Sequence, residues 1–274
     1  MHRPPAGEAI AVDETGLSFG IVEPYRLKTL YRPIFARRGE MLAPVALSAE
    51  VTIEQGGRPA ADAFSWMDAD ERTWLCWVGR RLAIRNLDHV GCEDPAFDLL
   101  LELSADTEEP CLEADALLAE AEAAGIAQTR VCLDLSEFAG AGAFGLLTRG
   151  LEAKGCSFAL DLAAASNSCG AGGPATAPAL VRIPPAWTRR IVGAVDLLRV
   201  LRLLVSTLRQ RGALVQIEGI EDAAQLRAAV AAGADRLAGD YLAAPALAGT
   251  DFDDSPRAFA KLIGAHSNVV PLSA

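Results

Sequence analysis

The feature that most constrains this chain is a regular alternation of short apolar segments with longer amphipathic ones between residues 96 and 241. Short runs rich in Val, Leu and Ile predict buried strands, and each is followed by residues with helical spacing. Strands that alternate with helices in this way pair in parallel and are covered by the helices. The expected strands span residues 96–103, 129–135, 157–162, 179–183, 214–217 and 236–241, and the expected helices span 112–124, 144–154, 187–211 and 223–232.

Two further strands and a helix are predicted before this region. Residues 30–35 and 44–53 are expected to pair around a turn at 37–40. Residues 68–87 have the spacing of an amphipathic helix, with Asp70 as the expected N-cap. With about seven or eight strands and no glycine fingerprint of a dinucleotide site, a closed α/β barrel is favoured over an open sheet.

The chain is expected to form one domain, because no linker rich in Pro or Gly divides it. The barrel is predicted to span residues 25–267, after a loosely ordered lead-in at 1–24 and before a tail at 268–274. Residues 255–266 are expected to form a closing helix, and the small-residue stretch at 166–178 is expected to be a long surface loop.

Composition excludes several classes of function. Hydrophobic residues make up 51% of the chain, enough for a large core, and the formal charge of −11 argues against nucleic acid as the partner. No apolar run approaches the roughly 18 residues of a membrane span, and no signal peptide is recognisable, so a cytoplasmic location without membrane insertion is expected. Six cysteines without a CxxC pair and three scattered histidines do not predict a disulfide framework or a zinc site.

Polar residues recur where the predicted strands end. Each alone is more often a helix cap or a solvated residue, but the ends of successive parallel strands meet at one face of a barrel. Converging oxygen ligands hold hard divalent cations, which can activate water and neutralise a phosphodiester. The residues concerned are Glu102, Asp134, Asp161, Arg182 and Glu218, with Asp235 and Asp240 near the last strand.

Several short motifs together resemble the EAL domain family, bacterial phosphodiesterases that linearise cyclic di-GMP. Ile217-Glu-Gly-Ile-Glu221 is similar to the family's Ala-Glu-Gly-Val-Glu, and it is followed by Gly233-Ala-Asp235 and by the segment 238–245 that ends in Pro. Tyr31-Arg-Pro-Ile34 is similar to Tyr-Gln-Pro-Ile. Phe158-Ala-Leu-Asp-Leu162 and Leu180-Val-Arg-Ile183 resemble two further family strands. The order agrees over residues 25–265, and the resemblance implies a TIM-like (β/α)8 barrel of the EAL type with one antiparallel strand near the N-terminus.

The resemblance also implies an altered active site. The glutamate of the name-giving Glu-Ala-Leu falls at Val45, and the second of two adjacent aspartates falls at Leu162. The remaining metal-ligand positions are Glu102 (Asn in the family), Asp134 (Glu in the family), Asp161 and Glu218. The catalytic positions are Arg182, where the family has Lys, and Glu221; the ligand-binding positions are Arg32, where the family has Gln, and Asp240; the family's late Gln falls at Ala238.

These replacements bear directly on hydrolysis. Two-metal catalysis needs both ions about 3.5–4 Å apart, and Val45 and Leu162 cannot replace charged ligands. Arg182 cannot deprotonate as a lysine can. We therefore expect a degenerate EAL domain, not an efficient enzyme, that acts as a regulatory or protein-interaction module in bacterial cyclic di-GMP-related signalling.

Two alternatives stay open at this level. One is a cyclic di-GMP receptor without turnover, and the other is a slow phosphodiesterase with Mg²⁺ or Ca²⁺ at a residual site formed by Glu102, Asp134, Asp161 and Glu218. The expected partner is another signalling protein. The family often dimerises through a helix after the paired aspartates, and the corresponding segment 166–178 is too rich in Gly, Pro and Ser to form such a helix dependably, so the family-type homodimer is not expected.

Overall fold

A closed barrel of eight strands organises the part of the chain that the computed structural model describes, residues 9–60, 62–90, 97–103, 109–140, 142–168 and 177–264. The strands follow the order β3-β11-β10-β9-β8-β7-β6-β4, and the pairing of β4 with β3 closes the ring. β3 runs antiparallel to both of its barrel neighbours, whereas the other adjacent pairs are parallel. The predicted barrel with one antiparallel strand is thus confirmed. Its strands are β3 (Tyr25–Arg38), β4 (Met41–Gln55), β6 (Asp98–Glu102), β7 (Val131–Asp134), β8 (Ser157–Asp161), β9 (Leu180–Ile183), β10 (Leu214–Ile217) and β11 (Arg236–Leu237).

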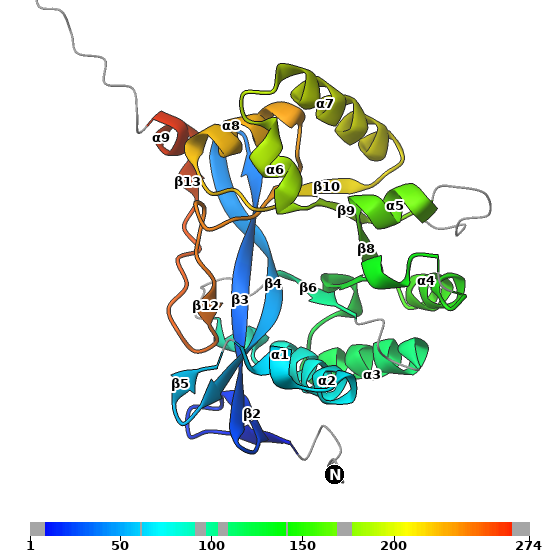
Figure 1. Cartoon of the computed structure of the whole chain (residues 1–274), viewed down its shortest axis with the longest axis vertical. Helices are drawn as coiled ribbons and strands as arrows, with labels where there is room; N and C mark the ends of the chain where they lie inside the picture. Colours follow the sequence, from blue (N-terminus) through cyan, green and yellow to red (C-terminus); the bar gives the residue numbers. More distant parts are fainter. Residues whose placement is uncertain are drawn as a thin grey trace, which may run out of the picture.

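Helices surround the parallel strands (Figure 1). They are α2 (Ala69–Arg85), α3 (Pro110–Ala123), α4 (Phe144–Ala153), α5 (Leu162–Ser168), α6 (Pro185–Ile191), α7 (Val195–Gln210) and α8 (Ala223–Ala232). Because successive side chains of a strand point to opposite faces, each strand contributes to two cores. Leu99 and Leu101 belong to the large core shared with the helices, whereas Leu100 belongs to a small cluster with Ile34, Ala46, Cys132, Ala159, Leu180 and Ala238.

The β3–β4 hairpin is far longer than the other barrel strands and supports a second, smaller core at the lower end of Figure 1. β1 (Ile10–Val12) and β2 (Ser18–Val22) extend the sheet from β3, and β5 (Arg58–Pro59) extends it from β4. Leu27 and Ile53 of the hairpin pack there with Leu75 and Val78 of α2, near α1 (Ala63–Trp66). The lead-in expected to be loosely ordered therefore contains two paired strands, because their apolar side chains cover this core.

Three local expectations were wrong. The N-cap of α2 is Asp68, whose Oδ1 accepts a hydrogen bond from Glu71 N at 2.8 Å, and not Asp70. The helix expected over 187–211 is two helices, because Gly193 adopts a left-handed φ of 76° between α6 and α7. The third is the loop expected over 166–178: its residues 166–168 belong to α5, and its residues 169–176 lie outside the described residues.

The end of the chain also differs from its expected helix at 255–266. β12 (Ala246–Leu247) pairs with β3, and β13 (Arg257–Ala258) pairs with β4 before the short helix α9 (Phe259–Gly264). The residues after 264, including the expected tail, lie outside the described part. Short 3₁₀ turns occur at Leu87–His89, Gln128–Arg130 and Ser136–Phe138. Among the described helices, none combines the length and apolar content needed to cross a bilayer.

Candidate functional site

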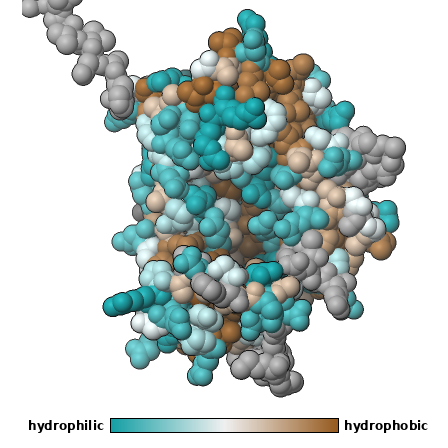
Figure 2. Space-filling model, in the orientation of Figure 1, coloured by the Kyte–Doolittle hydropathy of each residue, from teal (hydrophilic) through white to brown (hydrophobic). Residues whose placement is uncertain are grey.

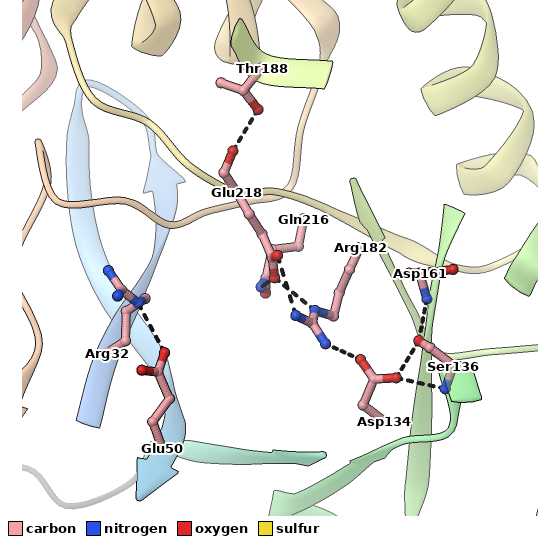
Figure 3. Close-up of polar contacts among 9 residues, drawn as sticks. All are labelled: Arg32, Glu50, Asp134, Ser136, Asp161, Arg182, Thr188, Gln216 and Glu218. Atoms are coloured by element: carbon pink, nitrogen blue, oxygen red, sulfur yellow. Dashed lines mark hydrogen bonds and ion pairs between the residues drawn. The ribbon is translucent and has the colours of Figure 1, made fainter. Parts of the chain in front are cut away.

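Polar side chains gather where the parallel strands end, at the mouth of the barrel (Figure 3). Asp134 is the last residue of β7, Arg182 is the third residue of β9, and Glu218 directly follows β10. Parallel strands bring their carboxyl ends to one face, which is where barrel proteins place their functional groups. The structure thus brings together three of the residues that the sequence predicted for this site.

Arg182 joins the two carboxylates. Its Nε donates to Glu218 Oε1 at 2.7 Å, its Nη2 lies 3.3 Å from Glu218 Oε2, and its Nη1 donates to Asp134 Oδ2. The side chain of Asp134 is 1% exposed and that of Glu218 is 16% exposed. Burial by itself would lower the pKa of Arg182, but hydrogen bonds and charges from Glu218 and Asp134 raise it above the ordinary value. The guanidinium is therefore a permanent cation between β7 and β10.

The remaining oxygen of Asp134 is also bound. Oδ1 accepts hydrogen bonds from the backbone N of Ser136 at 2.8 Å and from the Ser136 hydroxyl. The same hydroxyl oxygen accepts a hydrogen bond from the backbone N of Asp161 at 2.7 Å. Ser136 thus fixes Asp134 to the neighbouring strand β8.

Gln216 of β10 also contacts Glu218 and lines the cavity at the mouth. Its Nε2 donates to Glu218 Oε1 at 2.8 Å, and this contact assigns the orientation of the amide. The Gln216 side chain is buried, and its Oε1 has no hydrogen-bond partner among the described residues. From the other side, the Thr188 hydroxyl of α6 donates to the backbone O of Glu218 at 2.5 Å. Glu218 is therefore held at both its side chain and its backbone.

Asp161, predicted as a metal ligand, has a different role in the structure. Its Oδ1 accepts a hydrogen bond from the backbone N of Ala164 at 2.6 Å, so the carboxylate caps the first turn of α5. The adjacent Leu162 is buried in the main core, on the helical side of the barrel. Val45, at the position of the family's glutamate, packs against the apolar cluster inside the barrel.

Glu102, at the end of β6, is the register neighbour of Asp134 but faces a different cavity from the one beside Arg182. It lines a separate cavity of about 310 Å³ with Glu50, Glu137 and residues of α2. Burial of its carboxyl group raises its pKa above the ordinary value, and the negative charge of Asp134 raises it further, while Arg182 acts in the opposite direction. This carboxylate is thus close enough to Asp134 to repel it.

A second cavity, of about 350 Å³, opens at the mouth beside Arg182, Gln216 and Glu218. Arg32 at its rim pairs with Asp240 and, at 3.4 Å, with Glu50, whereas Arg189 lies 3.8 Å from Glu221. The two predicted ligand-binding residues, Arg32 and Asp240, are therefore neighbours that neutralise each other. Glu221, a predicted catalytic residue, is exposed at the rim.

The predicted metal ligands do not fit a metal ion in this arrangement. Within the described ranges, no three His, Cys, Asp or Glu side chains are grouped so that they could hold one. Asp134 and Glu218 direct their oxygens at Arg182, and Asp161 directs one at α5. A cation would have to displace the partly exposed guanidinium before it reached either of the first two carboxylates.

Sequence reasoning missed Glu50, Ser136, Arg189 and Gln216. Two of them had a recognisable pattern: Ser136 follows Asp134 at the spacing at which an aspartate accepts bonds from the residue two positions later, and Gln216 is a polar residue within an apolar strand. Glu50 and Arg189 had none, because they reach the mouth from a long hairpin and from the outer helix α6.

The fold and the mouth together define an eight-stranded barrel with a single reversed strand and a polar site at the carboxyl ends of its strands. The sequence matches the EAL domain model over residues 23–245, and the chain belongs to the EAL domain family. No curated protein matches the sequence.

Several solved structures have a similar fold. The manganese and cyclic di-GMP complex of Klebsiella pneumoniae BlrP1 is 16% identical with a TM-score of 0.67, over 85% of this chain and 59% of that one. Bacillus subtilis YkuI, with an EAL domain, in complex with cyclic di-GMP and calcium is 22% identical with a TM-score of 0.61, over 83% and 57%. The Xanthomonas citri FimX EAL domain in complex with cyclic di-GMP is 18% identical with a TM-score of 0.63, over 84% and 91%. The chain thus spans less than two thirds of BlrP1 and YkuI.

Proposed function

We propose that this chain is a non-hydrolytic EAL domain that acts as a regulatory or protein-interaction module in cyclic di-GMP-related signalling. The observation that carries the proposal is the position of Arg182, which binds Asp134 and Glu218 from between them. These are two of the four carboxylates that the family resemblance assigns to metal. Asp134 and Glu218 thus already have a positively charged partner in Arg182, in the place where a metal ion would otherwise balance their charge.

Charge explains why this arrangement opposes hydrolysis. A divalent ion at Asp134 or Glu218 would lie beside a guanidinium that does not deprotonate, and the two cations would repel each other. Moving Arg182 away would break its ion pair with Asp134, whose side chain is 1% exposed, and breaking a pair with a buried member is costly. Two ions bound about 3.5–4 Å apart, as two-metal hydrolysis requires, do not fit beside that side chain.

A receptor that binds cyclic di-GMP without turnover is the second candidate. It is supported by the cavity of about 350 Å³ at the mouth, which contains Arg32 and Arg189, and by the cyclic di-GMP complexes of the EAL proteins BlrP1, YkuI and FimX. Arginine is suited to bidentate phosphate binding. A phosphate would have to compete with Glu50 and Asp240 for Arg32, so binding of this kind is expected to be weak.

Calorimetric titration with cyclic di-GMP, run without metal, with Mg²⁺ and with Ca²⁺, tests these functions. Chromatography of each mixture reports the linear dinucleotide. The proposal expects no linear product under any condition, and steady formation of that product would refute it in favour of a slow phosphodiesterase. Heat without product would identify the receptor, and absence of heat would leave the interaction module.

A pair of variants sharpens this test. Arg182→Lys restores the residue of the family and removes the fork that spans the two carboxylates, whereas Arg189→Lys changes an exposed arginine of the same cavity. If Arg182 is what excludes the metal, Arg182→Lys gains Mg²⁺-dependent heat and Arg189→Lys does not. Equal behaviour of the two variants would contradict the role given to Arg182.

A further inference from the structure

Helices α6 and α7 expose an unusually large share of apolar side chains to solvent. Five of the ten most exposed large apolar side chains in the described residues lie between residues 192 and 214. Val195, Val200 and Leu203 of α7 are 64%, 57% and 71% exposed. Figure 2 shows apolar residues gathered at the upper right, where Figure 1 places α7. No described element packs over these side chains, although the opposite face of α7, with Leu201 and Val205, is buried.

The same segment carries a charge opposite to that of the chain. Residues 185–214 contain six of the 25 basic residues and one of the 36 acidic ones. Arg190 of α6 and Arg199 and Arg202 of α7 are exposed, and Arg199 lies 3.4 Å from Asp196; Arg189 belongs to the mouth cavity and is not part of this surface. The protein has a formal charge of −11, so an anionic partner repels most of its surface. The same partner attracts the local positive surface, and the protein therefore turns this surface toward it.

We propose that the exposed face of α7, with Arg190 of α6, binds to the surface of an anionic lipid bilayer without crossing it. A helix of this kind buries apolar side chains in the headgroup region while its basic residues contact lipid phosphates. Arginines suit this position because their apolar stems lie along the interface while the charged end reaches the headgroups. α7 is about 24 Å long, so it can lie flat on a bilayer without crossing it.

Other occupants of this face are less well matched. A second copy docking through the same face would bring the arginines of both copies together. A protein partner is usually anchored by aromatic side chains, and the exposed apolar residues of this face are valines and leucines. A fluid lipid surface needs no complementary groove for an outward-facing helix. This inference is independent of what the barrel mouth binds.

Co-sedimentation with vesicles tests the proposal on the full chain. Vesicles of phosphatidylcholine alone are compared with vesicles that contain equal parts of phosphatidylcholine and phosphatidylglycerol. We expect binding to the anionic vesicles only, and we expect added salt to weaken it. No binding to the anionic vesicles, or equal binding to both kinds, would overturn the proposal.

Variants separate this surface from general charge effects. Leu203→Asp and the double change Arg190→Gln/Arg199→Gln are each expected to weaken binding at least about tenfold. The matched control is Leu146→Asp/Arg149→Gln on α4, where Leu146 is 61% exposed and Arg149 is also exposed. Equal loss in the control would refute the assigned face. Circular dichroism and thermal unfolding confirm that each variant is folded.

Self-association is the remaining outcome. Sedimentation velocity of the wild type and of Leu203→Asp, without lipid, measures whether a second copy covers α7. A dimer that Leu203→Asp abolishes would overturn the lipid proposal, because the face would then be buried in solution. A monomer in both cases agrees with it.

Discussion

Arg182 shows how one side chain can define the chemistry of a whole site. A lysine at this position would offer a single compact charge, whereas the guanidinium donates from three nitrogens to two carboxylates on different strands. Asp134 has almost no exposed surface, so its charge depends on these donors and on Ser136. Arg182 thus joins two carboxylates that a single ammonium group could not bridge with the same three donors.

Arg182→Leu is expected to lower the free energy of unfolding by about 3 kcal/mol, because it leaves the charge of buried Asp134 without its main partner. Urea unfolding measures the loss. Arg189→Leu is the matched control, since Arg189 and Glu221 are both more than half exposed and 3.8 Å apart, and its effect should stay below about 0.5 kcal/mol. Similar losses in the two variants would show that Arg182 is not the central contact.

Glu102 makes stability depend on pH. Its pKa is raised in the folded state, so the folded protein binds its proton more tightly than the unfolded chain. This favours the folded state at low pH, and the contribution is lost as the pH rises through the folded pKa. Glu102→Gln should therefore be more stable than the wild type near neutral pH, and the difference should shrink as the pH falls through the raised folded pKa toward the ordinary pKa of a glutamate.

Urea unfolding of both proteins across this pH range measures that difference. Glu122→Gln, an exposed change on α3, is the control for removal of one negative charge from an acidic protein. If both variants gain the same stability at every pH, the local surroundings of Glu102 are not the cause.

Element boundaries in this protein depend on single residues. Asp161 ends β8 and caps α5, so one carboxylate sets both where the strand stops and where the helix starts. Gly193 separates α6 from α7 in a similar way, because its left-handed φ is unfavourable for any residue with a Cβ.

Asp161→Ala should lower stability by about 1 kcal/mol through loss of the cap of α5. Asp161→Ser retains an oxygen that can accept the bond from Ala164 N and should recover most of that loss. Thermal unfolding compares the two variants. Equal destabilisation by Ala and Ser would mean that the carboxylate acts mainly through its charge at the barrel mouth and not as a cap.

Gly193→Ala and Gly150→Ala form a matched pair at the level of the helix. A Cβ atom added at Gly193 would meet no other atom within 4 Å, so the expected loss of about 1 kcal/mol comes from the backbone alone. Gly150 lies inside α4 with equal space and helical backbone, and alanine there should add about 0.5–1 kcal/mol. Opposite signs in urea unfolding are the expected result, and a gain in both would show that α6 and α7 can join into one helix.

The whole molecule combines a barrel with a smaller core beneath the extended hairpin. Leu27 is fully buried in that smaller core, together with side chains of α2. The two cores share β3, β4 and α2, so the hairpin connects parts of the molecule that could open separately.

Leu27→Ala should lower stability by about 3 kcal/mol, because a buried leucine leaves a cavity. Hydrogen exchange measured by mass spectrometry should show faster exchange in β1, β2 and the first half of α2 than in β7 to β10. Equal acceleration in all of these elements would show that the two cores unfold as one unit.

Much of this architecture follows from the sequence alone. The apolar strands with amphipathic helices between them specify a parallel sheet covered by helices, and the number of strands together with the missing dinucleotide glycine fingerprint favoured the closed barrel over an open sheet. Asp134, Arg182 and Glu218 could be placed at its mouth because the carboxyl ends of parallel strands lie together. Local errors fell at Asp68, Gly193 and Asp161, where one hydrogen bond or one dihedral angle decides the outcome.

Only the tertiary structure decided what the polar residues do. The position of a carboxylate along its strand tells which end of the barrel it occupies. It does not tell which donor reaches it, because that depends on side-chain contacts between strands far apart in sequence. Arg182 donates hydrogen bonds to Asp134 and Glu218, and Ser136 donates to the other oxygen of Asp134. Asp161 instead accepts a hydrogen bond from the first turn of α5. The sequence determined a barrel with charged residues at its mouth; the packed structure determined which donor binds each carboxylate, with Arg182 shared between Asp134 and Glu218.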